Sequence, residues 1–165
     1  MAKTDLTAAR LRELLHYNPD TGVFTWVEPA INKQFLRGSI AGSRMVNGYL
    51  SLCIAQKRYY CHRLAWLYMT GESPREHIDH INGNPADNRF CNLREATRCQ
   101  NMQNLRAKRS TVGAFFHKTF GLWYSKIRVN KVDLFLGYFK TEMDAHNAYK
   151  QAKLTHHPFG RDVRM

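Results

Sequence analysis

The residues best suited to chemistry lie in one polar segment, residues 78–104. It opens with the adjacent pair Asp79-His80, continues through a loop rich in Asn, Asp, Gly and Pro, and includes Asn92 and Asn101. A carboxylate and an amide oxygen are hard donors that suit Mg²⁺, and two protein ligands leave room for water and phosphate oxygens. A histidine with a near-neutral pKa can take a proton from an attacking water. The segment therefore predicts metal-assisted phosphodiester hydrolysis, with Asp79 and Asn101 as metal ligands and His80 as base.

Asp79 and His80 can share such a site only in a particular place. Neighbours along a strand face opposite sides, so the pair must lie where a strand ends and bends. Gly83 and Pro85 favour a bend just after it, and residues 93–96 are expected to return as a short strand.

A helix is expected to follow the returning strand. Thr97, with Gln100 three residues later, fits a capping box. Asn101 then falls in the first turn of the helix or just past it, close to the strand. The prediction is a compact unit of two strands and a helix.

The preceding residues are expected to form two helices with strands between them. Thr7 can cap a helix that contains the leucines at 11, 14 and 15, and turn-forming residues at 17–22 end it. Strands are expected over 23–27, 49–54 and 57–61. A helix with a broad apolar face follows over 62–69, ended by Gly71 and Pro74, and His62 is interpreted as a core or helix-start residue.

The residues after the polar segment suggest a second module. The basic stretch 106–110 either finishes a helix or links to that module. Two β-rich runs, 123–129 and 132–139, are separated by Asn130-Lys131 and predict a hairpin. Thr141 is expected to cap a final helix whose apolar stripe covers the hairpin.

Charge indicates the class of partner. The 165 residues hold 25 Lys and Arg against 13 Asp and Glu, a formal charge of +12, which favours a polyanion and nucleic acid first. No apolar run approaches the roughly 18 residues of a membrane-spanning helix, and the first residues lack the apolar core of a signal peptide. We expect a soluble protein of the cytoplasm that binds double-stranded DNA and no membrane.

The four cysteines, at 53, 61, 91 and 99, form no Cys-x-x-Cys pair. Reduced thiols are therefore expected rather than disulfides or a structural zinc site. The eight histidines keep a mixed Cys/His zinc site open as an alternative.

The polar segment resembles the ββα-metal motif of HNH nucleases, in the variant found in phage and intron-encoded homing endonucleases. The matching positions are Asp79-His80, Asn82 to Asn84, Asp87 to Arg89, Asn92 to Arg94, Thr97 and Asn101. The resemblance implies that His80 is the general base, that Asp79 and Asn101 hold the metal, and that Asn92 braces the loop around the histidine. Mg²⁺ is the expected ion and Mn²⁺ the second choice. Many relatives have a second histidine where this chain has Asn101.

The resemblance extends to both sides of this motif. Residues 14–26, Gly48-Tyr49 and residues 62–66 resemble the amino-terminal region of the same phage enzymes. Residues 112–152 are similar to the AP2 DNA-binding domain, at Gly113, Trp123, Ile127, Leu136 to Phe139, Thr141, Ala145, Ala148-Tyr149 and Ala152. The candidate DNA contacts are basic or aromatic and follow from position and charge: Arg94 and Arg98 beside the centre, Arg106, Lys108 and Arg109 in the basic stretch, and Lys118, Trp123, Lys126, Arg128 and Lys131 on the exposed face of the AP2-like sheet.

The sequence thus predicts an α+β protein with a ββα-metal core between small DNA-binding modules. Residues 1–60 form an amino-terminal DNA-binding portion, 61–106 the nuclease core, 107–111 a basic linker, and 112–165 an AP2-like domain of three antiparallel strands and a helix. The expected function is that of a site-specific, metal-dependent homing endonuclease that needs no small-molecule cofactor and, as a monomer, nicks one strand. Two alternatives stay open: a regulatory DNA-binding protein with an inactive nuclease fold, and a zinc-stabilised nucleic-acid module.

Overall fold

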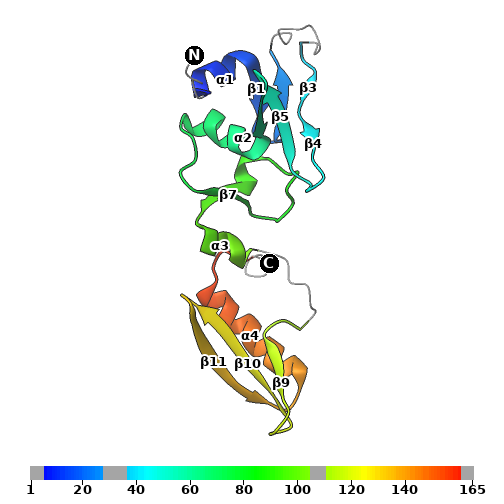
Figure 1. Cartoon of the computed structure of the whole chain (residues 1–165), viewed down its shortest axis with the longest axis vertical. Coiled ribbons are helices and arrows are strands. Elements are labelled where there is room, and N and C mark those ends of the chain that lie inside the picture. The colour runs from blue at the N-terminus through cyan, green and yellow to red at the C-terminus, as the bar shows by residue number, and fades with distance from the viewer. Residues whose placement is uncertain (1–5, 28–36, 105–110, 161–165) are drawn as a thin grey trace. The chain divides into compact units, whose positions relative to one another are not determined.

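A computed structural model describes residues 6–27, 37–104 and 111–160 of the chain. The chain divides into two compact units, Met1–Thr97 and Arg98–Met165, and each is considered by itself (Figure 1). Both mix helices with small antiparallel sheets, as expected of an α+β protein. In the described part of the chain no helix is long and apolar enough to cross a membrane.

The first unit holds two helices, three small sheets and a 3₁₀ turn. Its elements are α1 (Ala8–Leu14), β1 (Leu15–Asn18), β2 (Val23–Trp26), β3 (Ile40–Ala41), β4 (Ser43–Arg44), β5 (Leu50–Ile54), β6 (Lys57–Tyr60), α2 (Cys61–Thr70), β7 (His77–His80), a 3₁₀ helix (Phe90–Asn92) and β8 (Leu93–Ala96). The sheets have the strand orders β1-β2-β3, β4-β5-β6 and β7-β8. The predicted strands and the helix ended by Gly71 are all present, and Gly71 has the left-handed φ of 83° expected of a C-cap.

The start of the chain differs from the sequence-based expectation in one respect. The Thr7 side chain caps α1 by accepting from the backbone N–H of Arg10 at 3.2 Å, as predicted. The helix ends at Leu14, however, and Leu15–Asn18 pairs with Val23–Trp26 instead of forming the last turn and a loop. Burial alternates along β1, so Leu15 and Tyr17 enter the core of the unit while His16 and Asn18 face outward. The strand period therefore prevails over the helical spacing of the leucines.

One apolar core runs through the first unit, from its amino-terminal elements to the hairpin of β7 and β8. Its members come from α1, β1, β2, β5 and α2, and also from the hairpin of β7 and β8, which contributes Ile78 and Leu93. Leu11, Leu15 and Phe24 are at most 1% exposed. The polar segment is consequently supported by residues from near the start of the chain.

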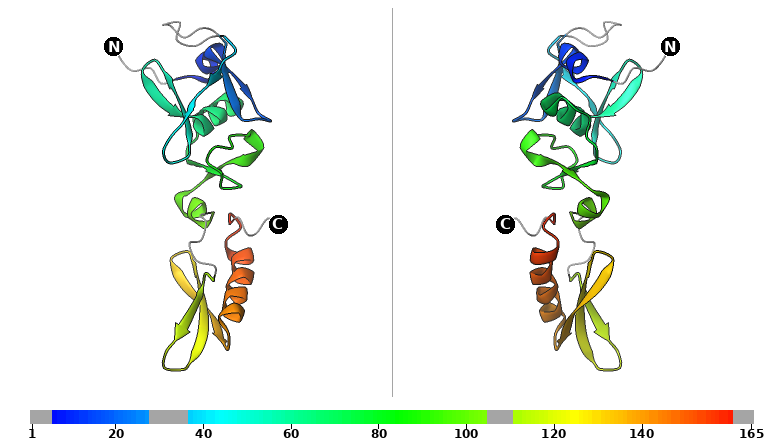
Figure 2. Two further views of the ribbon diagram at one scale, coloured as in Figure 1. Left: turned by 90° about the vertical axis from the view of Figure 1, so that its right-hand side faces the viewer. Right: turned by 90° about the vertical axis from the view of Figure 1, so that its left-hand side faces the viewer.

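The second unit places one long helix against a small sheet. Its elements are α3 (Arg98–Gln103), β9 (Ala114–His117), β10 (Leu122–Val129), β11 (Val132–Phe139) and α4 (Glu142–His156), and β10 is the central strand. Figures 1 and 2 show α4 lying along one face of the sheet, where Ser125 and Ile127 of β10 are buried. Three antiparallel strands and a helix were expected here; the likeness to the AP2 domain remains a prediction.

Local sequence signals in the second unit are matched by the structure. Asn130 and Lys131 have φ values of 49° and 71° and form the tight turn between β10 and β11. The side chain of Thr141 accepts from the backbone N–H of Asp144 at 3.1 Å and caps α4. The predictions of a hairpin and of this cap are confirmed.

Candidate active site

Asp79 and His80 are the last two residues of strand β7. The strand pairs antiparallel with β8, with His77 opposite Ala96 and His80 opposite Leu93. A loop of residues 81–92 joins the two strands, so the pair lies where the strand ends, as predicted. Asp79 is 5% exposed and His80 4% exposed. Both ionisable groups are therefore largely removed from water.

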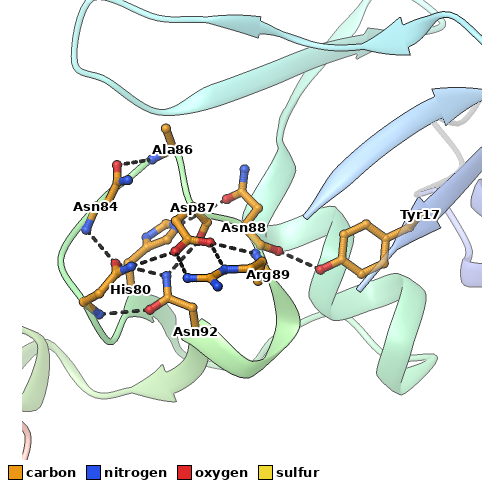
Figure 3. Close-up of polar contacts among 9 residues, drawn as sticks. Tyr17, His80, Asn84, Ala86, Asp87, Asn88, Arg89 and Asn92 are labelled. Atoms are coloured by element: carbon orange, nitrogen blue, oxygen red, sulfur yellow. Dashed lines mark hydrogen bonds and ion pairs between the residues drawn. The ribbon is translucent and has the colours of Figure 1, made fainter. Parts of the chain in front are cut away.

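Asn92 connects the two sides of this loop (Figure 3). Its Nδ2 donates to Asn82 Oδ1 at 3.1 Å and to the carbonyl of Asp87 at 2.8 Å, and its Oδ1 accepts from the N–H of Asn82 at 2.9 Å. A buried amide that makes three hydrogen bonds holds the loop in one conformation. This arrangement is compatible with the bracing role implied by the family resemblance.

Asp87 and Arg89 form a second tie within the loop. Arg89 donates to the two carboxylate oxygens of Asp87 at 2.8 and 2.6 Å, and Asn82 Nδ2 donates to Asp87 Oδ2 at 2.7 Å. Hydrogen bonding from Arg89, with a smaller share from Asn82, lowers the pKa of Asp87 to about 2. These residues belong to the motif quoted from the sequence, but no role was predicted for them.

The imidazole of His80 is held through Asn88. Its Nε2 lies 3.1 Å from Asn88 Oδ1, and Asn88 is 1% exposed. Burial lowers the pKa of His80, whereas the bond to Asn88 and the charges of Asp79 and Asp87 act in the opposite direction. An amide oxygen at Nε2 selects the tautomer that is protonated there, which leaves the lone pair on Nδ1. A neutral imidazole with that lone pair suits a general base.

Asp79 pairs with Arg94, its cross-strand neighbour. Arg94 donates from Nε at 2.8 Å and from Nη2 at 2.6 Å to Asp79 Oδ2. The Arg94 side chain is 17% exposed and that of Asp79 6%, so this is a largely buried ion pair. The sequence predicted Asp79 as a metal ligand and Arg94 as a phosphate contact and did not predict their pairing.

The donor chemistry at Asp79 fits a hard divalent cation. A carboxylate offers about four acceptor positions on its two oxygens, and carboxylate oxygens are ligands that such a cation prefers. Among the described residues, no group of three or more His, Cys, Asp or Glu could hold a metal. Amide, water and phosphate oxygens are further hard donors that suit the same ion.

An aromatic wall that the sequence did not predict lies beside His80. Its members are Tyr49, Tyr60 and His62, and the ring centroids of His62 and Tyr49 lie 5.1 and 5.8 Å from that of His80. His62 is 8% exposed, and its Nδ1 has no hydrogen-bond partner among the described residues. Burial, followed by the neighbouring His80, lowers the pKa of His62 to about 3. The wall thus places an uncharged imidazole and two tyrosine rings on this side of the candidate base.

The remaining predicted site residues belong to the second unit or lie outside the described residues. Asn101 and Arg98 are in α3, which belongs to the second unit and is described apart from Asp79 and His80, so the role of Asn101 as a metal ligand stays a prediction. Arg106, Lys108 and Arg109 lie outside the described residues.

The candidate contacts of the second unit do not all share one face. Lys118, Arg128 and Lys131 are exposed, and Lys126 is half-buried. The alternation along β10 puts Trp123 on the face of Ser125 and Ile127, opposite Lys126 and Arg128. The expectation that Trp123 lies with them on the exposed face is therefore corrected.

The cysteines are all free thiols. Cys53, Cys91 and Cys99 are exposed, whereas Cys61 is buried at the start of α2. Burial raises the pKa of the Cys61 thiol to about 12, so this cysteine is a protonated core residue.

Comparison with known proteins adds one finding to this geometry. Residues 59–103 match the model of an HNH endonuclease family, a stretch that covers well under half of the chain and includes Asp79, His80, Asn92 and Asn101. No curated protein and no solved structure matches the chain. The match supports a nuclease, and nucleases of this kind generally use a divalent metal ion.

Proposed function

We propose that the protein is a metal-dependent DNA endonuclease of the HNH type, with His80 as its general base. The observation that carries this proposal is the position of His80, which lies at the end of β7 within the family-matched range and is held by Asn88 through Nε2. This combination of a buried, neutral imidazole and a fixed tautomer is what proton abstraction at neutral pH requires.

His80 acts by taking a proton at Nδ1 from the water that attacks phosphorus, while the bond from phosphorus to the 3′ oxygen breaks and the released oxygen takes up a proton from solvent. Asn88 keeps the proton on Nε2, and Asn92 keeps the loop in place through its three hydrogen bonds. A divalent ion, Mg²⁺ first and Mn²⁺ second, would supply Lewis acidity at the phosphate, with Asp79 as its ligand in the first unit and Asn101 as the predicted further ligand.

The second unit serves as a DNA-binding module in this proposal, with an AP2-like arrangement. Lys118, Arg128 and Lys131 are exposed there, and the chain as a whole carries a formal charge of +12. Exposed cations bind phosphates irrespective of base sequence and raise the rate at which the protein meets DNA. In this proposal the general base lies in the first unit, and the second unit supplies most of the DNA contacts together with the predicted ligand Asn101.

The proposal includes a homing-type enzyme that works as a monomer in the cytoplasm of a bacterial host. A single catalytic histidine serves one scissile bond at a time. A monomer should therefore nick one strand, and a double-strand break would require a second binding event.

The test is nicking of supercoiled plasmid carrying genomic DNA with the natural site, in Mg²⁺ or Mn²⁺. The wild-type protein should yield open circles, and His80→Ala should lower the rate on the order of 10³-fold, in line with the loss of a general base. His156→Ala, at an exposed histidine in the last turn of α4, is the matched control and should keep wild-type activity. Equal nicking by His80→Ala would exclude this mechanism, and absence of nicking with normal DNA binding would favour a DNA-binding protein with an inactive nuclease fold.

A further inference from the structure

The turn between β1 and β2 packs against the loop that holds the candidate base. The turn is ordered by Asn18, whose Oδ1 accepts from the N–H groups of Asp20 and Thr21 at 3.0 and 3.1 Å. The carbonyl of Pro19 then accepts from the N–H of Phe90 at 3.0 Å. A turn that is fixed by its own side chain thus forms a backbone bond to residues more than sixty positions later.

Gly22 shows how close this approach is. Its φ is +73°, and a Cβ built on it would lie 2.5 Å from the backbone of both Asn88 and Arg89. Real Cβ atoms do not come that near to backbone atoms, so only glycine fits between the turn and the loop. The hairpin of β1 and β2 is therefore in direct contact with the backbone at Asn88.

Tyr17 adds a hydrogen bond at the same residue. Its hydroxyl donates to the carbonyl of Asn88 at 2.6 Å, and the side chain is 2% exposed. Its ring packs on Phe24 and Tyr68, with centroids 4.7 and 5.6 Å away, so the hydroxyl has little freedom. Burial raises the pKa of Tyr17, and the group stays a protonated donor.

Asn88 is thus fixed at its backbone while its side chain contacts His80. Figure 3 shows Tyr17 pointing at this residue from the β1–β2 hairpin, and Asn88 lying between Tyr17 and His80. The Nδ2 of Asn88 has no partner among the described residues, so its Oδ1 bond to His80 is what defines the orientation of the amide. A shift of the Asn88 backbone would therefore be passed directly to the imidazole.

We propose that the β1–β2 hairpin is a positioning element of the active site: Tyr17 and the Gly22 turn hold Asn88, and Asn88 orients His80. The proposal rests on the proposed function for its catalytic consequence. It assigns a role in the reaction to residues that lie outside the family-matched range 59–103 and that were expected to belong to a DNA-binding portion.

The kinetic test compares two tyrosines of one aromatic cluster. Tyr17→Phe removes the donor to Asn88 and keeps the ring, and kcat for nicking should fall about tenfold with KM unchanged, because a small displacement of a base is costly. Tyr68→Phe removes a hydroxyl that makes no hydrogen bond to residues 81–92 in the described structure, and kcat should stay within about twofold. Equal kcat values for Tyr17→Phe and wild type would overturn the proposal.

A second measurement does not depend on activity. At one fixed neutral pH, ¹⁵N NMR of wild-type His80 should show the Nε2–H tautomer, and Tyr17→Phe should mix the two tautomers and speed hydrogen exchange at the Phe90 amide. Asn88→Leu should lose the tautomer preference, and Asn88→Asp, which keeps an acceptor, should restore it. Unchanged spectra in Tyr17→Phe would overturn the positioning role. These spectral changes in a protein that does not nick DNA would support the positioning contact and overturn the proposed function instead.

Discussion

The two units use polar and aromatic side chains in opposite ways. In the first unit the polar side chains closest to the candidate base are buried and hydrogen-bonded, with Asp79, His80, Asn88 and Asn92 each at most 6% exposed. In the second unit large aromatic side chains remain on the surface, among them Phe120 at 60% and Phe135 at 54%. One region is built to hold a geometry, and the other presents side chains to a partner.

Six aromatic side chains of the second unit, four of them exposed, form one continuous set of ring contacts. They lie on β9, β10, β11 and the turn after β9, and the set comprises Phe115, His117, Phe120, Tyr124, Phe135 and Tyr138. Lys126 Nζ lies 6.0 Å from the centre of the Phe115 ring. Exposed apolar surface of this kind is typical of contact surfaces, and the nearby cations suit a nucleic acid.

This difference leads to different expectations for mutations. A change in the first unit should alter the reaction and the fold together, because its polar groups are mutually bonded. We call the sheet face that carries Lys126, Arg128 and these aromatic rings the open face of the second unit. A change on this face should alter DNA binding and leave the chemistry intact. Three experiments test this contrast, in order of decreasing effect.

The largest effect is expected at the buried ion pair. Arg94→Met leaves the Asp79 carboxylate buried without its cation, and the free energy of unfolding should fall by about 3 kcal/mol in urea titrations. Added Mg²⁺ should recover part of that loss if Asp79 binds the ion. In the second unit, Lys126→Met breaks a pair with Asp133 whose side chains are 40% and 43% exposed, and it should change stability little. Similar losses in the two variants would remove the contrast between the units.

A smaller effect is expected from the pH dependence of stability between pH 7 and 5. The pKa of His62 is lowered to about 3 in the folded protein, while the unfolded chain binds a proton near pH 6.5. Below pH 6.5 the unfolded state therefore binds a proton that the folded state does not bind. The free energy of unfolding falls as the pH drops toward 3, by up to about 1.4 kcal/mol per pH unit.

His62→Phe should flatten this slope between pH 7 and 5 in urea unfolding. Some slope should remain, because the pKa of His80 is lowered in the same way. His16→Phe, at an exposed site, should leave the wild-type slope. If the His62→Phe slope equals that of wild type, burial of this imidazole does not set the acid stability of the first unit.

The smallest effect is expected on the open face. The Arg128 side chain is 72% exposed, and Arg128→Ala should weaken DNA binding severalfold and reduce the salt dependence of log K by about one phosphate contact. The value of kcat at saturating DNA should not change. Lys150→Ala, an exposed lysine of α4, is the matched control on the other side of the unit. Loss of kcat in Arg128→Ala would show that the open face takes part in more than binding.

Local signals in the sequence predicted most elements. Thr7 and Thr141 cap the expected helices, and Asn130-Lys131 forms the expected turn, because each signal acts within a few residues of its effect. The strand Leu15–Asn18 was missed because its apolar residues also satisfy a helical spacing, and only pairing with Val23–Trp26 selects the strand.

The polar motif predicted the position of Asp79 and His80, but it could not supply their partners. The Asp79–Arg94 pair depends on the register of β7 and β8, which the sequence does not fix. The bond from Tyr17 to Asn88 spans 71 residues, and nothing local distinguishes this tyrosine from the other seven. His62 was expected in the core, but its place beside His80 follows only from tertiary packing.

The shared core of the first unit has a consequence for folding. Leu11, Leu15 and Phe24 belong to the same core cluster as Ile78 of β7 and Leu93 of β8, the two strands that the 81–92 loop joins. The family-matched stretch 59–103 thus supplies only part of the core against which its strands pack, and the rest comes from earlier residues. The 81–92 loop should therefore acquire its structure in the same cooperative step as the amino-terminal hairpin, and a fragment restricted to residues 59–103 should not fold.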